Sequence, residues 1–107
     1  MEFLNKVELK GIIGGVKLLQ VGDNKVANIS VLTNYMSQDK SGMPVVETQW
    51  HNVKVWDTAS KTSLDEYGKG DKVHLTGRLR TIRYTAPEGD RTFTEIVASK
   101  INKLEEE

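Results

Sequence analysis

Polar and apolar side chains alternate over residues 47–57, which read Glu-Thr-Gln-Trp-His-Asn-Val-Lys-Val-Trp-Asp. Successive side chains of a β-strand point to opposite faces, so the alternation predicts a strand whose Val53 and Val55 face a core. Trp50, Lys54 and Trp56 then share the outward face, which is normally polar. Two large rings there predict a surface that stacks a ligand, although either ring alone could equally pack under a loop or against a neighbouring subunit.

Four further segments have the alternation, or the β-branched and aromatic content, of strands: residues 3–15, 25–34, 72–84 and 91–101. The inward set of the second segment is Ala27, Ile29 and Val31. In the third of these segments, Arg78, Arg80 and Tyr84 share the outward face. Gly14 and Gly15 fit no phosphate-binding fingerprint, and they predict a bend or bulge in the first strand instead.

The connections between the strands carry turn and loop signals. Glycine, proline, asparagine and aspartate predict tight turns at residues 21–24 and 86–90. Residues 34–44 predict a polar loop of about a dozen residues, longer than most hairpin connections. This loop either folds over a ligand with Tyr35 or is a solvated hairpin tip.

The alternation stops over residues 57–69, where the sequence predicts one short helix. Asp57 or Thr58 is the expected N-cap, and Gly68 is the expected end. Three strands, a short helix and two strands, with hairpin connections elsewhere, are the layout of an OB-fold. The sequence therefore predicts an all-β, five-stranded Greek-key OB barrel, whose second and third strands form the usual binding face.

The composition fits one small domain and removes several kinds of site. We expect the OB domain to cover residues 1–104 of the 107, followed by an acidic end at 105–107. Cysteine is absent, which removes disulfides and thiolate metal sites. The first residues do not resemble a signal peptide, and no run approaches the roughly 18 apolar residues of a membrane helix, so we expect a cytoplasmic protein.

The formal net charge is zero, with 15 basic and 15 acidic side chains, so charge alone does not indicate a nucleic-acid partner. Positive charge is nevertheless concentrated between residues 72 and 84, and at ordinary salt each charge acts within only about 10 Å. Rings interleaved with cations suit single-stranded nucleic acid, because each base offers a π face and each phosphate a negative charge. The candidates for phosphate contacts are Lys6, Lys10, Lys54, Lys72, Arg78, Arg80 and Arg83.

No arrangement of residues indicates catalysis, a metal or a cofactor. His51 and His74 are isolated, and the sequence contains no nucleophile and base at a recognisable spacing. His51 shares the inward alternation of its strand, so a hydrogen-bonded interior or interface histidine is favoured over a metal ligand. We therefore expect a binding protein and not an enzyme.

Several short motifs recur together along the chain: Asn5-Lys6-Val7, Val26-Ala27-Asn28-Ile29, Thr48-Gln49-Trp50-His51-Asn52-Val53, Glu66-Tyr67 with Lys69-Gly70, and Gly77-Arg78-Leu79-Arg80-Thr81. Together they resemble the bacterial single-stranded DNA-binding proteins, which coat DNA during replication, repair and recombination. The resemblance runs from about residue 5 to residue 101. It implies non-sequence-specific binding of single-stranded DNA.

The resemblance also implies roles for particular residues. Bases would stack on Trp50, Trp56 and Tyr84. A further stacking tryptophan of many members falls near Ser37, where this chain has no ring unless Tyr35 replaces it. The histidine at the position of His51 lies near the subunit contact in the family, so a homotetramer is expected.

The end of the chain departs from the family pattern. Full-length members continue into a disordered linker with an acidic tip ending in Pro-Phe, which recruits replication and repair proteins. This sequence stops at Glu107 without that tip, so the resemblance does not assign those partners, and a naturally short chain and a shortened one both remain open. The alternative functions are an RNA-binding OB module, which would use the same rings, and a protein-interaction OB domain, in which the tryptophans would be partner hot spots.

Overall fold

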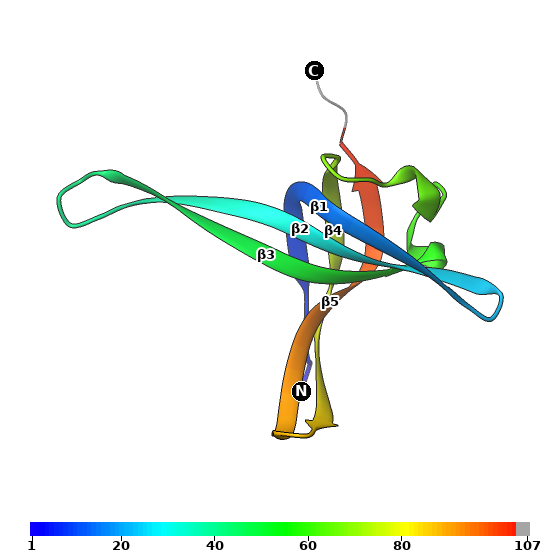
Figure 1. Cartoon of the computed structure of the whole chain (residues 1–107). Helices are drawn as coiled ribbons and strands as arrows, with labels where there is room; N and C mark the ends of the chain where they lie inside the picture. The colour runs from blue at the N-terminus through cyan, green and yellow to red at the C-terminus, as the bar shows by residue number, and fades with distance from the viewer. Residues whose placement is uncertain (105–107) are drawn as a thin grey trace.

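The computed structural model describes residues 1–104 and consists almost entirely of β-structure. Its elements in chain order are β1 (Val7–Val21), β2 (Asn24–Gln38), β3 (Pro44–Trp56), the 3-10 turns η1 (Asp57–Ala59) and η2 (Leu64–Glu66), β4 (Lys72–Ala86) and β5 (Gly89–Lys103). The strands form one closed barrel in the order β1-β2-β3-β5-β4 (Figure 1). The predicted five-stranded OB barrel is confirmed, whereas the acidic end expected at 105–107 lies outside the described residues.

The barrel closes because β1 belongs to two ladders and β3 meets β5. The part of β1 up to Ile12 pairs with β4, and the part from Ile12 onward pairs with β2. The register between β1 and β2 shifts between Ile13 and Gly15, so Gly14 is the extra residue of the predicted bulge. β3 and β5 are parallel and pair over Val53–Val55 alone.

The core is built from the inward positions of every strand. The valines predicted to face it, Val53 and Val55, are almost completely buried, as are Ala27, Ile29 and Val31 of β2. Burial of these alternating side chains removes apolar surface from water, which is the main favourable term in folding. The alternation therefore identified the inner face of the barrel correctly.

Three hairpins extend beyond the barrel, as Figure 1 shows. The radius of gyration is 16.2 Å, compared with about 13 Å for a compact domain of about 100 residues. The prediction of a polar loop at residues 34–44 is wrong, because β2 continues to Gln38 and β3 begins at Pro44. Cross-strand pairs such as Met36 with Val46 extend the ladder into this hairpin. We call it the β2–β3 arm.

The single short helix predicted after β3 is instead two separate 3-10 turns. Ser63 caps η2, since its hydroxyl accepts a hydrogen bond from the Asp65 amide at 3.2 Å. Ser60 donates to or accepts from the Tyr67 hydroxyl at 2.8 Å. Hydroxyl side chains that bond locally compete with helical hydrogen bonds, which explains why the segment breaks in two. Within residues 1–104, no helix has the length and apolarity needed to cross a membrane.

Candidate nucleic-acid interface

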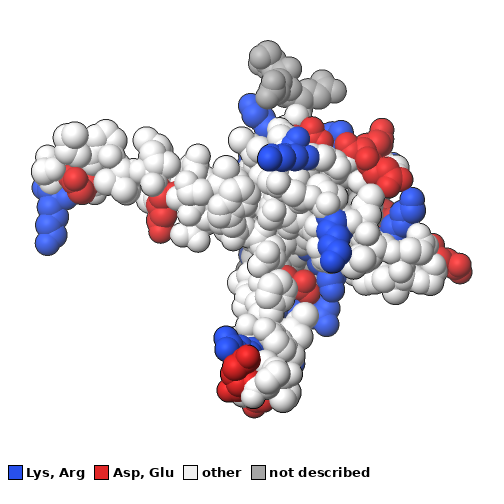
Figure 2. Space-filling model, viewed as in Figure 1, with Lys and Arg blue, Asp and Glu red and all other residues white. Residues whose placement is uncertain are grey.

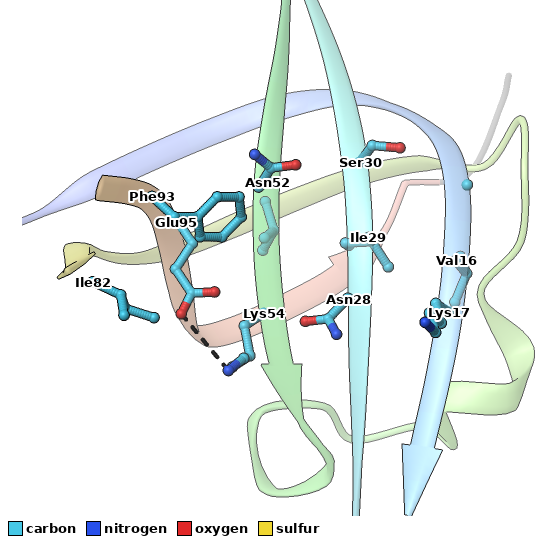
Figure 3. Close-up of a pocket in the computed structure, with 12 residues that line it drawn as sticks. Val16, Lys17, Asn28, Ile29, Ser30, Asn52, Lys54, Ile82, Phe93 and Glu95 are labelled. Atoms are coloured by element: carbon cyan, nitrogen blue, oxygen red, sulfur yellow. Dashed lines mark ion pairs between the residues drawn. The ribbon is translucent and has the colours of Figure 1, made fainter. Parts of the chain in front are cut away.

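A groove of about 610 Å³ crosses the outer face of β1, β2 and β3, and the β4–β5 hairpin forms one of its walls (Figure 3). Its polar floor consists of two cross-strand rows, Lys17-Asn28-Lys54 and Gly15-Ser30-Asn52. Its wall consists of Ile82, Phe93 and Glu95. Small polar side chains on the floor leave the surface low enough for a flat ligand and supply hydrogen-bond donors and acceptors.

Trp50 stands on the outer face of β3, where it is 59% exposed. The ring lies over the bulge in β1, because a Cβ atom on Gly14 would overlap Cζ3 of the indole and lie 2.8 Å from Cη2. The missing side chain of Gly14 therefore makes room for the ring. The bulge gives Trp50 a supported position with an exposed face, as a stacking platform requires.

A smaller hollow of about 190 Å³ lies beside the main groove and is lined by Trp50, Asn52 and Glu95, among others. Asn52 and Glu95 also line the main groove. The two hollows are therefore neighbours, and together they run from Trp50 to Lys54 along β3.

Lys54 and Glu95 form an ion pair inside the groove, with Nζ and Oε1 3.7 Å apart (dashed line in Figure 3). Glu95 is 5% exposed, and its Oε1 has no hydrogen-bond partner among the described residues. A buried carboxylate is costly unless it is paired and hydrogen-bonded, so this one has a countercharge but an unused acceptor.

Trp56 ends β3 at the other side of the groove from Trp50. The two rings are six strand positions apart, which corresponds to about 20 Å. Trp56 is only partly exposed, lies opposite the buried Val26, and is not among the residues that line the groove. The structure therefore keeps both tryptophans on the predicted outer face but does not bring them together.

Tyr84 and Phe93 lie on the β4–β5 hairpin. Tyr84 is about half exposed and lies opposite Arg91, towards the tip. Phe93 is similarly exposed, lies opposite Ile82 and lines the groove. The sequence reading missed Phe93 because the register irregularity near Ser99 interrupts the alternation of β5. The sequence does contain a signal for Phe93. Ile96 and Ala98 face the core, and Phe93 lies an odd number of residues before each of them, so its side chain points to the outer face of β5.

Of the seven predicted phosphate contacts, the structure places Lys54 in the groove. Lys6 and Arg78 line a separate hollow of about 430 Å³ beside the N-terminal segment. Lys17 lines the groove but was not predicted, because the first strand was expected to end at Gly15 and in fact continues to Val21.

The remaining cations lie on β1 and β4. Lys10 is opposite His74 and Lys72 is opposite Ile12, both on the half of the barrel where β1 pairs with β4. Arg80 pairs across the ladder with Glu95. Arg83 pairs with Thr92, and it points to the opposite face of its hairpin from Tyr84.

The two histidines are both hydrogen-bonded. His51 Nε2 lies 2.8 Å from the Thr33 hydroxyl, as expected for a satisfied histidine, and its place at a subunit contact stays a prediction. His74 Nε2 lies 2.7 Å from Glu8 Oε2, and this hydrogen bond lowers the pKa of the Glu8 carboxyl. Among residues 1–104, no cluster of three histidine or acidic side chains could hold a metal ion.

Charge is sparse over the face shown in Figure 2. The arm and the centre of the barrel are mostly uncharged there, whereas acidic side chains gather near the η1 and η2 turns. Such a surface offers a ligand stacking and hydrogen bonding more than a broad positive field.

Comparison with known proteins agrees with this geometry. The family model described as the single-strand binding protein family matches residues 4–104. A single-stranded DNA-binding protein of Neisseria meningitidis is 33% identical over 105 residues, which cover 94% of this chain and 60% of the relative. One from Xanthomonas campestris is 30% identical, with the same coverage of both proteins. The chain thus spans about 60% of the length of these curated relatives.

Two solved structures have the same fold. One is described as a Plasmodium falciparum SSB complex with ssDNA; it is 30% identical, covers 98% of both chains and has a TM-score of 0.79. The other is a deletion mutant of the single-stranded DNA binding protein of Thermus aquaticus, with a TM-score of 0.84 over 95% of this chain and 51% of that one. At 19% identity the second supports the fold alone. The match over residues 4–104, on a barrel of this topology, shows that the chain belongs to the single-strand binding protein family.

Proposed function

We propose that this protein binds single-stranded DNA without requiring a particular sequence, and that it protects the strand in replication, repair and recombination. The observation that carries the proposal is the groove together with the neighbouring hollow, because the two combine the supported ring of Trp50, the ring of Phe93 and a polar floor with two lysines. Membership of the family and the likeness to a structure described as a complex with ssDNA support it.

The rings supply most of the binding free energy in this proposal. Stacking of a base on an aromatic side chain contributes roughly 1 to 3 kcal/mol and tolerates any base. Phe93 stacks a base in the groove and Trp50 stacks one in the neighbouring hollow. Tyr84, towards the tip of the β4–β5 hairpin, and Trp56, at the end of β3, extend the path of the strand. Lys17 and Lys54 contact phosphates, and Arg78, Arg80 and Arg83 remain candidates for contacts outside the groove.

The proposal includes a homotetramer, with His51 near the contact between subunits. It also includes a cytoplasmic location, because the protein has to meet the DNA that it protects. The family resemblance supports both statements.

The test is a titration with poly(dT) that follows tryptophan fluorescence and, in parallel, the affinity for a labelled dT oligomer. Trp50→Ala should weaken binding by about 1 to 3 kcal/mol, and Trp56→Ala should weaken it less, because Trp56 is partly buried and outside the groove. Phe3→Ala is the matched control, since this ring is 89% exposed and does not line the groove.

Two results together would refute the proposal. The tryptophan fluorescence of the wild-type protein would stay unquenched during the titration, and a Trp50→Ala/Trp56→Ala double variant would bind the dT oligomer normally. A competing RNA oligomer that displaces DNA at equal concentration would favour the RNA-binding alternative. A protein partner retained through Trp50 in the absence of nucleic acid would favour the protein-interaction alternative.

A further inference from the structure

The side chain of Asn5 takes the place of a strand residue at the edge of β4. Its Nδ2 donates a hydrogen bond to the Leu79 carbonyl oxygen at 2.8 Å, and its Oδ1 accepts one from the Leu79 amide at 2.9 Å. The ladder between β1 and β4 ends where Val7 pairs with Gly77. Asn5 precedes Val7 by two residues and Leu79 follows Gly77 by two. The carboxamide therefore fills the next position at which the backbone of β4 faces β1.

Leu79 belongs to the cross-strand pair at which the β4–β5 hairpin leaves the barrel. It lies opposite Ile96, and Ile96 is the first residue of β5 that pairs with β3, opposite Val53. Within residues 1–104, no ladder joins residues 80–95 to a third strand. The base of the hairpin is thus held by Asn5 on one edge and by Val53 on the other. Figure 1 shows the N-terminal segment beside this base.

The shape of the groove depends on where this hairpin stands. Ile82 and Phe93 lie opposite each other beyond the base and form part of the wall, whereas the floor belongs to β1, β2 and β3. Figure 3 shows the Phe93 ring projecting from β5 towards β3. A rotation of the hairpin about its base would move this ring relative to the floor and leave the floor in place.

Asparagine has the groups that this anchoring requires. Its planar carboxamide carries a donor and an acceptor side by side, as the backbone of Leu79 does, so the two hydrogen bonds fix both distance and orientation. Aspartate would keep the acceptor and lose the donor, and alanine would lose both.

We propose that Asn5 is a positioning residue for the DNA groove, which sets the β4–β5 hairpin where Phe93 can stack a base above the floor. The inference rests on the proposed function, in which Phe93 stacks a base. It deepens that function by giving a role to a residue that lies outside the groove and precedes the first strand.

A double-mutant cycle on the affinity for a dT oligomer tests this role. Phe93→Ala should weaken binding by the wild-type protein about fivefold or more, the contribution of one stacked base. In an Asn5→Ala protein the same change should weaken binding less than about twofold, because the ring is already displaced. Lys17→Ala changes the floor instead and should weaken binding by the same factor in both proteins.

Two further variants control for size and for loss of an amide. Asn5→Asp has the shape of the native side chain but cannot donate to the Leu79 carbonyl, so it should also reduce the effect of Phe93→Ala. Asn24→Ala is the matched control, since Asn24 is exposed at the start of β2. It should leave the effect of Phe93→Ala unchanged.

Hydrogen exchange of the free protein gives a readout without DNA. The Leu79 amide should exchange about fivefold faster in Asn5→Ala, because it loses its acceptor. The Leu75 amide lies further along the same strand, opposite Leu9, and should keep its exchange rate. A general loss of stability would accelerate both amides.

An equal effect of Phe93→Ala in the wild-type and Asn5→Ala proteins, or no effect in either, would overturn the inference and leave single-strand binding intact. Loss of the Lys17→Ala effect as well would also overturn it, because Asn5 would then act on the whole groove. An unchanged exchange rate of the Leu79 amide would do the same. Absence of wild-type binding to every oligomer would instead refute the proposed function.

Discussion

Gly14 and Trp50 act as one unit although they lie on different strands. Gly14 is the bulged residue of β1, and the Trp50 ring occupies the space that a side chain at position 14 would fill. Its φ is not positive, so an alanine there meets no backbone restriction and acts through the ring alone. The position of the ring therefore depends on the absence of a side chain on another strand.

We predict that Gly14→Ala displaces the Trp50 ring and weakens binding of a dT oligomer by about 1 to 3 kcal/mol, the contribution of one stacked base. Tryptophan emission of the free protein should shift, because the ring leaves its supported position. Gly68→Ala is the control, since its Cβ would meet no atom within 4 Å. Unchanged emission and affinity in Gly14→Ala would show that the ring does not depend on this gap.

At the scale of elements, one carboxylate accepts three hydrogen bonds at the tip of the β2–β3 arm. Asp39 Oδ1 accepts hydrogen bonds from the Ser41 amide at 2.9 Å, the Ser41 hydroxyl at 2.7 Å and the Met43 amide at 2.9 Å. Gly42, with φ of +87°, makes the turn that brings these groups together. The hydrogen bonds of Ser41, followed by that of Met43, hold the pKa of Asp39 below its ordinary value of 3.8.

A lowered pKa in the folded state means that the ionised carboxylate stabilises the tip. This contribution is complete above pH 3.8 and is lost as the pH falls through the lower pKa of the folded state. We predict that the Ser41 and Met43 amide resonances titrate together in an NMR experiment, with a midpoint below 3.8. Asp39→Asn should abolish that titration, and a wild-type midpoint at or above 3.8 would contradict the assignment.

The alternation of side chains predicted the strands and their inner face because burial imposes it, as Val53 and Val55 show. It could not predict where strands end once they leave the barrel. Leu79 has the inward alternation but is 49% exposed, because the ladder between β1 and β4 ends at Gly77 and leaves this part of β4 uncovered. For the same reason the sequence predicts a loop over residues 34–44, where the structure has the β2–β3 arm.

The site was less predictable because it depends on which outward residues a distant hairpin faces. Trp50 and Lys54 were found from one strand alone, but Glu95 and Phe93 join them only through the packing of β5 beside β3. Lys17 was missed because β1 continues beyond its bulge. Where the register between strands shifts, the alternation of polar and apolar side chains no longer assigns residues to the correct face.

At the scale of the whole molecule, the proposed function requires a neutral chain to bind a polyanion through few cations. Lys17 and Lys54 are the lysines among the residues that line the groove, and Lys54 already has Glu95 as a partner. Each phosphate neutralised on a single strand contributes a slope of about −0.7 to the dependence of log K on log salt concentration. Binding should therefore depend on salt only weakly.

We predict a slope between about −1 and −2 for a short dT oligomer, measured from its affinity over a range of NaCl concentrations. Lys54→Ala should make the slope less steep by about 0.7, whereas Lys61→Ala, which removes the same charge outside the groove, should not change it. A slope steeper than about −2 would mean that further cations, such as the arginines on β4, also contact phosphates.

The short parallel seam between β3 and β5 has a consequence for how the protein becomes active. This seam joins segments far apart in the chain, over Val53–Val55 and Ile96–Ala98, whereas the hairpins form from neighbouring segments. Contacts of such long sequence separation cost more loop-closure entropy than hairpin contacts and slow folding. Lys54 and Glu95 meet across this seam, so a newly made chain with all three hairpins in place still lacks the groove until the barrel closes.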